Sequence, residues 1–379
     1  MDPTTRRRLG SSSVHVTALG LGTVPLGGLY SPVEEADGLA LVRRAYDLGV
    51  RLFDTAPQYG VGLSERRLGM VLPEFPRDSI VVATKVGRLL RPVSLLGKTR
   101  QVVSEAAANR DLRRIGLGAR HLVHRLRSSD VHGATAAGGG DRPATPRLEA
   151  IFDFSPDGVR RSLEESLARL RLDRVDVVYF HDPDYYHDQA LAAFKVLEEL
   201  RSAGTIGAIG VGMNQSAMLA RFAREADFDC FLVAGRYTLL DQIALHDLLP
   251  VCQERGSSIV IGGVYNSGIL ADARPGAYFD YHPAPPAVLQ RAQRIQAVCS
   301  RYDVPLAAAA IQFPFGHPSV ASVLTGSRSV AEIEQNAALF SHPIPDELWD
   351  DLRAEGLLPD QVPTPRAGHP AAERVAAHA

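Results

Sequence analysis

The feature that most constrains the fold of this 379-residue chain is an eightfold alternation of short apolar runs with longer helical patterns. Strands that alternate with helices form parallel sheets, because each helix returns the chain to the same edge of the sheet. The sequence therefore predicts an α/β protein with one parallel sheet. The predicted strands span residues 17–23, 50–53, 80–85, 175–181, 206–211, 230–234, 258–261 and 320–324.

Eight strand–helix units fit a closed (β/α)8 barrel, the TIM-barrel class. The alternative is an open doubly wound sheet, whose dinucleotide-binding domain carries GxGxxG after its first strand. Gly20-Leu21-Gly22-Thr23 lacks the third glycine, and no helix begins there. We therefore predict a single barrel domain over residues 1–359. The tail at 360–379 is rich in Pro and Ala, and we expect it to be disordered.

Local sequence signals predict the helices and one small hairpin. The segment from Arg8 to Val16 can form a hairpin ahead of the first strand. Ser64 is expected to cap the helix that follows the second strand. An extra C-terminal helix is predicted from Pro345 to Glu355. The other predicted helices span residues 33–48, 64–72, 156–170, 189–203, 215–225, 245–255, 286–302, 306–313 and 330–340.

The alternation is interrupted once, by a long insertion at residues 88–148 after the third strand. It carries many more Arg and Lys than Asp and Glu, and it has weak helical character from Arg100 to Arg127. The insertion leaves the strand-end face, where barrels of this class hold their catalytic residues. It is either a lid or phosphate-attracting cover, or a partly disordered insertion that the barrel tolerates.

Polar residues end three of the predicted strands. Asp54 and Tyr59 follow the second strand, Lys85 ends the third, and His181 ends the fourth. Each of these residues alone could have a structural role, such as capping a helix or filling the core. At successive strand ends of one barrel, however, they should lie together at one mouth.

These four residue types suit proton transfer at a carbonyl or alcohol oxygen. A free phenol titrates near pH 10, and a lysine ammonium beside it favours the phenolate. A buried ammonium needs a carboxylate as counter-ion, and a histidine can hydrogen-bond the substrate oxygen. Such proton transfer is half of a hydride-transfer reaction, so a nicotinamide cofactor is expected beside the site.

Composition narrows the function classes further. A net charge of −2 favours neither nucleic acid nor an anionic membrane as partner. Cys230, Cys252 and Cys299 have no CxxC spacing, which argues against disulfides and against a metal site. We expect a cytoplasmic protein that binds a small molecule and is a monomer or a weak homo-oligomer.

The motifs Phe53-Asp54-Thr55-Ala56-Pro57-Gln58-Tyr59-Gly60, Ala83-Thr84-Lys85 and His181-Asp182-Pro183 resemble the aldo-keto reductase superfamily. The resemblance runs from about Leu9 to Leu352. It implies a (β/α)8 barrel that binds NAD(P) without a Rossmann domain. It also implies that Tyr59 is the catalytic acid/base, that Lys85 and Asp54 tune it, and that His181 orients the substrate.

Within the superfamily, the chain most resembles the branch that contains D-threo-aldose 1-dehydrogenase and pyridoxal 4-dehydrogenase. The motifs for this are His181-Asp182-Pro183-Asp184, residues 210–215 and residues 262–268. Many relatives have a tryptophan where this chain has Asp182. A carboxylate there favours a substrate rich in hydroxyl groups, and the alternative is a structural aspartate that orients its neighbours.

The resemblance also implies a set of cofactor contacts. Glu332 near the ribose would favour NAD by repelling a 2′-phosphate, whereas Arg328 favours NADP, so we expect NAD, with dual use as the alternative. The expected contacts are Gly22, Thr23, Asp54, Asn214, Gly263, Ser267, Gly268, Gly326, Ser327, Arg328, Glu332, Gln335 and Asn336.

The function expected from the sequence is NAD(P)-dependent oxidation of the anomeric hydroxyl of an aldose, of the L-fucose or D-arabinose type, to the lactone. Tyr59 would be its acid/base and Asp182 a substrate contact. One alternative is an NADPH-dependent aldehyde or ketone reductase, and another is a pyridoxal dehydrogenase. A third, a cofactor-sensing regulatory subunit without catalysis, fits an intact set of four residues poorly.

Overall fold

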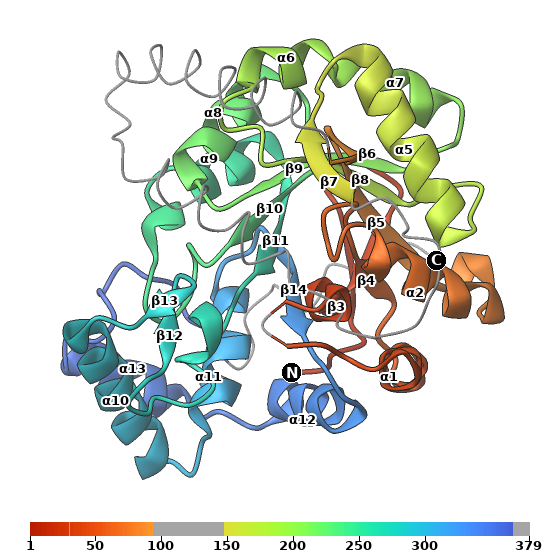
Figure 1. Ribbon diagram of the computed structural model, residues 1–379. Helices are drawn as coiled ribbons and strands as arrows, with labels where there is room; N and C mark the ends of the chain where they lie inside the picture. Colours follow the sequence, from red (N-terminus) through yellow and green to blue (C-terminus); the bar gives the residue numbers. More distant parts are fainter. Residues whose placement is uncertain (30, 94–147, 367–379) are drawn as a thin grey trace, which may run out of the picture.

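Eight parallel strands close into a barrel in the computed structural model, which describes residues 1–29, 31–93 and 148–366 (Figure 1). Barrel strands that follow one another in the sequence are also neighbours in the barrel. The last strand, β14, closes the barrel against the first, β3. The (β/α)8 prediction is therefore confirmed. The barrel strands are β3 (Leu19–Gly22), β4 (Leu52–Asp54), β5 (Val81–Val86), β8 (Val177–His181), β9 (Ala208–Met213), β10 (Cys230–Ala234), β11 (Ser258–Gly262) and β14 (Val320–Gly326).

Helices form the outer ring around these strands (Figure 1). Within the described ranges, no helix is both long and apolar enough to cross a membrane. The extra C-terminal helix is present as α13 (Asp346–Ala354). The other helices are α1 (Glu35–Asp47), α2 (Leu63–Val71), α5 (Pro156–Leu170), α6 (His187–Ala192), α7 (Phe194–Ser202), α8 (Ser216–Glu225), α9 (Leu248–Arg255), α10 (Pro286–Arg301), α11 (Leu306–Gln312) and α12 (Val330–Ser341).

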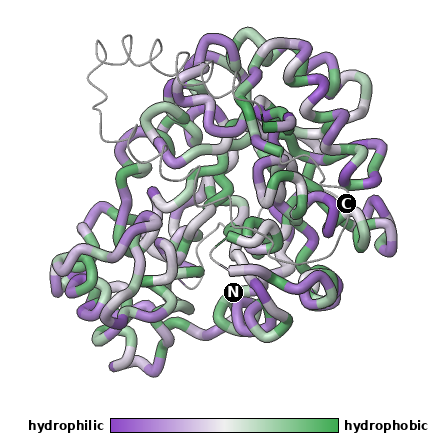
Figure 2. Tube along the Cα trace, in the orientation of Figure 1, coloured by the Kyte–Doolittle hydropathy of each residue, from purple (hydrophilic) through white to green (hydrophobic). Residues whose placement is uncertain are grey.

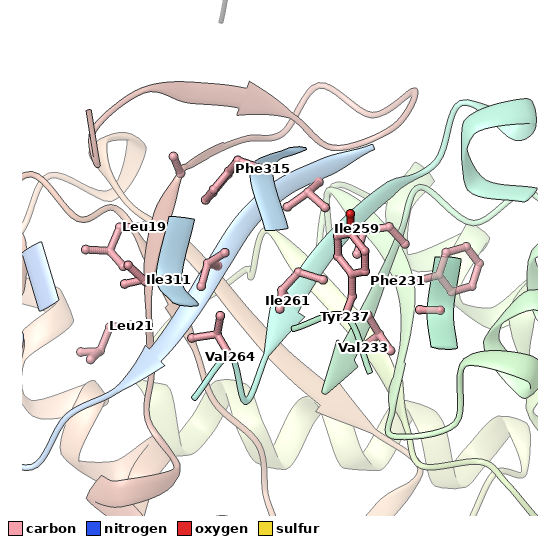
Figure 3. Packing of buried hydrophobic residues seen from close by; sticks show 14 of the residues in the cluster. Leu19, Leu21, Phe231, Val233, Tyr237, Ile259, Ile261, Val264, Ile311 and Phe315 are labelled. Carbon is pink, nitrogen blue, oxygen red and sulfur yellow. The ribbon is translucent and has the colours of Figure 1, made fainter. Parts of the chain in front are cut away.

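Side-chain alternation along the strands divides the core into two clusters. The outer cluster lies between strands and helices, and Figure 3 shows Ile259 and Ile261 of β11 in it together with Ile311 of α11. The central strands are correspondingly more hydrophobic than the surrounding helices (Figure 2). The inner cluster fills the barrel, because every second residue of a strand points to the same face. It includes Leu52, Ala83, Val177, Tyr179, Ala208, Cys230, Leu232, Val260 and Leu324.

The start of the predicted insertion is a strand. β6 (Arg88–Pro92) pairs antiparallel with β7 (Leu148–Phe152), so the insertion begins and ends in a two-stranded ribbon. Both strands are short, and their separation in the chain hides the pairing from local sequence signals. The helical character predicted for residues 100–127 lies outside the described residues.

The boundary of the predicted disordered tail is wrong for residues 360–366. Val362 and Thr364 are buried, and Arg353 donates to the Val362 carbonyl at 2.9 Å and to Thr364 Oγ1 at 2.8 Å. A Cβ on Gly316 would lie 2.5 Å from the Pro363 carbonyl oxygen, so this glycine allows the segment to pack closely. Residues 367–379 lie outside the described ranges.

Two smaller predictions have opposite outcomes. The N-terminal hairpin forms from β1 (Arg6–Arg8) and β2 (His15–Thr17). Ser64 does not cap α2, because Gly62 occupies the N-cap with a left-handed φ of 82°. Ser64 Oγ instead donates to Thr23 at the end of β3, at 2.9 Å to the carbonyl oxygen and 2.7 Å to Oγ1.

A buried histidine, His317, lies shortly before β14 and predicts acid sensitivity. Burial lowers the pKa of His317 to about 4, from 6.5 in the unfolded chain. The unfolded state therefore binds more protons between these values, so stability present above about pH 6.5 is lost as the pH falls through about 4. We expect wild type to lose about 2–3 kcal/mol of unfolding free energy between pH 7 and 4.5 through this residue.

Urea denaturation at both pH values measures this effect. His317→Gln should show a flatter dependence on pH than wild type. The same change at the exposed His15 is the control and should leave the dependence as it is. Equal dependence in wild type and His317→Gln would contradict the prediction.

Candidate active site

Strand alternation directs three of the four predicted catalytic side chains into the barrel. Asp54, Lys85 and His181 each lie two residues beyond a member of the inner cluster, at the carboxyl ends of β4, β5 and β8. These strands are adjacent in the barrel. All three residues are buried, with exposures of 3%, 2% and 7%. The structure thus brings these three side chains together at one end of the barrel.

Asp54 and Lys85 form a buried ion pair. Lys85 Nζ donates to Asp54 Oδ2 at 2.7 Å, to Oδ1 at 3.0 Å and to the Thr55 carbonyl at 2.9 Å. Burial alone would lower the pKa of Lys85, but the Asp54 carboxylate, with Tyr59, raises it above its usual range. The ammonium is therefore charged at neutral pH.

Tyr59 reaches the pair from the loop after β4. Its ring lies 4.8 Å from Lys85 Nζ and 6.0 Å, edge-on, from the His181 ring. Glycines allow the loop to approach η1 (Val24–Gly27): a Cβ on Gly27 would lie 2.5 Å from Gly60 N. The packing of these two segments therefore fixes the position of Tyr59.

The direction of the Tyr59 pKa differs from the sequence expectation. Lys85 does act to lower this pKa, through its charge and a hydrogen bond, but burial of the phenol outweighs it and the pKa is raised. The negative charges of Asp54 and Asp182 act in the same direction as burial. The Tyr59 hydroxyl is therefore protonated at neutral pH.

Asp182 extends this site beyond His181. Its Oδ2 lies 3.8 Å from His181 Nε2, and its backbone has a left-handed φ of 47°. Arg88 Nη2 donates to the same oxygen at 2.7 Å, while the guanidinium lies 4.3 Å from the Phe152 ring centroid. Arg88 was not among the predicted site residues, although a cation three residues after Lys85 was a usable signal.

The expected cofactor residues of β3 and β14 lie beside the catalytic residues. Gly22 pairs with Asp54 on one side and with Gly326 on the other. The Thr23 backbone N–H and Oγ1 donate to the Asp54 carbonyl at 2.9 and 2.8 Å. Gly22 and Thr23 therefore hold the end of β4 in place.

The junction of β14 and α12 contains a buried polar network. Asn336 Nδ2 donates to Ser327 Oγ at 3.1 Å, and Tyr265 Oη donates to Asn336 Oδ1 at 2.9 Å. Tyr265 was not predicted. Gln335, which was, is exposed on α12. The network fixes the start of α12 against the loop after β11.

Arg328 and Glu332 form an ion pair on the surface of the same junction. Arg328 Nη2 donates to Glu332 Oε1 at 3.0 Å, and the Arg328 backbone N–H donates to Oε2 at 2.8 Å. Ser329 caps α12 and accepts from the Glu332 backbone N–H. The two residues that were expected to oppose each other in cofactor choice therefore compensate each other's charge.

The remaining expected cofactor contacts lie after β9 and β11. Asn214 follows β9, and its carbonyl accepts from Arg236 Nε at 3.0 Å, a second arginine that the sequence analysis missed. Ser267 Oγ accepts from the backbone N–H of Tyr281 at 2.9 Å and so anchors the turn between β12 (Tyr278–Phe279) and β13 (His282–Pro283). Gly263 and Gly268 have left-handed φ angles of 61° and 108° and are exposed.

These residues fit a dinucleotide across the mouth. Exposed Gly326 precedes the N-terminus of the 12-residue helix α12, whose backbone N–H groups suit a phosphate. Arg328 adds a cation there, and the ion pair of Asp54 and Lys85 lies on β4 and β5, which β3 separates from β14. Among residues 1–29, 31–93 and 148–366, no three His, Cys, Asp or Glu side chains gather as a metal site.

Comparison with known proteins agrees with the site. The model of the aldo/keto reductase family matches residues 18–355. The chain is 42% identical over 365 residues to a pyridoxal 4-dehydrogenase from Microbacterium luteolum, covering 93% of this chain and 98% of the relative. It is 40% identical over 353 residues to a D-threo-aldose 1-dehydrogenase from a Pseudomonas species, covering 92% and 97%.

Solved structures share the fold at lower identity. The holo form of an aldo-keto reductase from Bacillus halodurans has a TM-score of 0.65 and 22% identity, covering 93% of this chain and 96% of that one. A glycerol dehydrogenase from Gluconobacter oxydans has a TM-score of 0.65 and 21% identity, covering 97% and 99%. Enzymes of this family use NAD(P), so the barrel, its mouth and the match over residues 18–355 identify the chain as an oxidoreductase of the aldo/keto reductase family.

Proposed function

We propose that this enzyme oxidises the anomeric hydroxyl of an aldose, of the L-fucose or D-arabinose type, to the lactone. The observation that carries the proposal is the Asp182 carboxylate, 3.8 Å from His181 Nε2 and 28% exposed at the mouth. An ionised carboxylate accepts hydrogen bonds from several hydroxyl groups. An apolar wall at this position would leave a sugar's hydroxyls unpaired on desolvation.

The four residues divide the chemistry as follows. A bound nicotinamide supplies the hydride acceptor for the hydrogen on the anomeric carbon. His181 holds the anomeric oxygen, and Tyr59 takes the proton of that hydroxyl as the C–O bond becomes C=O. Lys85 stabilises the phenolate form that accepts this proton, and Asp54 keeps Lys85 charged. In the reverse direction Tyr59 returns the proton to the carbonyl oxygen.

A second candidate substrate is pyridoxal, the substrate named in the relative that is 42% identical. Its aldehyde lies beside a hydroxymethyl group, so it closes into a cyclic hemiacetal, as an aldose does. Oxidation of either hemiacetal gives a lactone and needs the same proton and hydride transfers. The two candidates therefore differ in recognition and not in chemistry.

Steady-state oxidation rates distinguish the candidates. The purified protein is assayed with L-fucose, D-arabinose and pyridoxal with each cofactor, by the absorbance of reduced nicotinamide. We expect kcat/KM for at least one aldose to exceed that for pyridoxal and for the reverse reduction of simple aldehydes. Turnover of aldehydes without oxidation of any sugar would overturn the aldose proposal, and oxidation of pyridoxal alone would favour the second candidate.

For the cofactor we propose NAD, because the charge of Arg328 is compensated by Glu332. Glu332→Gln removes this compensation and should raise the ratio of kcat/KM for NADP to that for NAD by about tenfold, since a free guanidinium attracts the 2′-phosphate. Glu334→Gln on the same helix, where Glu334 pairs with Arg44 at 2.7 Å, is the matched control. An unchanged ratio in Glu332→Gln would show that this pair does not face the ribose.

A further inference from the structure

The ion pair of Arg88 and Asp182 lies at the mouth, and the proton-transfer chemistry does not use it. Arg88 Nη2 donates to Asp182 Oδ2 at 2.7 Å, and the side chains are 8% and 28% exposed. The Asp182 carboxylate lies 3.8 Å from His181 Nε2, and its negative charge contributes to the raised pKa of Tyr59. A substrate that reaches Tyr59 and His181 therefore meets this pair.

The surrounding structure holds Arg88 in this place. Its carbonyl accepts from Ser162 Oγ of α5 at 3.0 Å, which fixes the backbone at the start of β6. Its guanidinium lies 4.3 Å from the Phe152 ring centroid on the paired strand β7. The arginine is thus pre-organised at the mouth rather than free to turn into solvent.

Asp182 is held in place as well. Its backbone N–H donates to the Gly212 carbonyl at 2.9 Å, and its φ of 47° lies in the left-handed region, which most residues other than glycine avoid. Asp tolerates this conformation better than most residues. The turn directs the carboxylate toward both Arg88 and His181.

We propose that Arg88 and Asp182 form a charge filter that selects uncharged substrates over anionic ones. A planar guanidinium at a mouth binds carboxylates and phosphates well, and Asp182 occupies that capacity. Arg88 in turn compensates the carboxylate, so that Asp182 serves as a hydrogen-bond acceptor for hydroxyl groups at a mouth that stays close to neutral. Arg88 is a specificity-determining residue in this account. The inference rests on the proposed substrate role of Asp182 but not on a sugar being the substrate.

Two aldehydes of similar shape and different charge test the filter in the reductive direction. The probes are 4-carboxybenzaldehyde, which is an anion at neutral pH, and 4-nitrobenzaldehyde, which is neutral. The readout is the ratio of kcat/KM for the anionic probe to that for the neutral probe. A loss of structure or of proton transfer lowers both values, whereas the ratio reports charge recognition.

Asp182→Asn should raise this ratio about tenfold, because the variant removes the negative charge that offsets the Arg88 guanidinium beside the probe's carboxylate. Arg88→Met, which keeps an apolar stem against Phe152, should lower the ratio, because Asp182 then repels the anion. The double variant should return close to the wild-type ratio. If Asp182→Asn does not fold, as judged by circular dichroism, Asp182→Ser removes the same charge.

The pair of Arg91 and Glu165 provides matched controls. It joins the same strand β6 to α5 at 2.9 Å, so Glu165→Gln and Arg91→Met change the net charge equally at another place. Neither should move the ratio by more than about twofold. An unchanged ratio in Asp182→Asn, an equal change in Glu165→Gln, or no reduction of either probe by wild type would overturn the filter. If Asp182→Asn raises the ratio of anionic to neutral probe but the wild-type enzyme oxidises no sugar, the filter is supported and the aldose proposal is rejected.

Discussion

Tyr59→Phe is expected to lower kcat/KM by a factor of about 10²–10⁴, the range for loss of a positioned acid/base. The phenol is the group of this site that lies against both the Lys85 ammonium and the His181 ring. Phenylalanine keeps the ring and its packing but cannot exchange a proton. Because the hydroxyl acts in the transition state, kcat should fall while cofactor affinity stays within about twofold.

Steady-state kinetics and titration of bound cofactor by fluorescence measure the two effects separately. Tyr302→Phe is a matched control. Tyr302 follows α10 on the outside of the barrel, and its hydroxyl donates a hydrogen bond to Asp351 Oδ2 at 2.8 Å. That variant should retain activity. Loss of both turnover and cofactor binding in Tyr59→Phe would show that Tyr59 is structural.

Lys85→Met is expected to be damaging in two ways. It leaves the Asp54 carboxylate buried without its counter-ion, which costs about 3–5 kcal/mol of unfolding free energy. It also removes the cation that favours the Tyr59 phenolate, so kcat/KM should fall by a factor of about 10² or more. Both residues are almost fully buried, so solvent cannot replace the lost interaction.

A double-mutant cycle separates the two effects. Asp54→Asn in the Lys85→Met background removes the uncompensated charge and should recover much of the lost stability, as measured by urea denaturation, without restoring activity. A double variant whose loss of stability equals the sum of the losses in Lys85→Met and Asp54→Asn would contradict the ion pair. Recovery of activity in the double variant would contradict the tuning role of Lys85.

Much of the fold could be predicted because its signals are local. Each barrel strand is a short apolar run, and each ends where a polar or glycine residue follows. Since parallel strands place their carboxyl ends on one face, Asp54, Lys85 and His181 could be predicted to meet before any coordinates were known. The match of Gly22 with both Asp54 and Gly326 follows from the same parallel pairing.

The structural features that could not be predicted depend on contacts between segments that are distant in the sequence. β6 pairs with β7 across the insertion, and only that pairing places Arg88 against Asp182. The burial of Val362 depends on Arg353 and on close approach to Gly316. The direction of the Tyr59 pKa depends on how deeply the phenol is buried, which no motif records.

Oxidation of an aldose deuterated at carbon 1 tests the central claim most directly. The product nicotinamide is analysed by proton NMR after turnover of C1-deuterated L-fucose or D-arabinose by the wild-type enzyme. Hydride transfer from the anomeric carbon predicts one deuterium on the reduced nicotinamide ring for each lactone formed. Reduced nicotinamide without deuterium, or no oxidation of either sugar, would contradict the account.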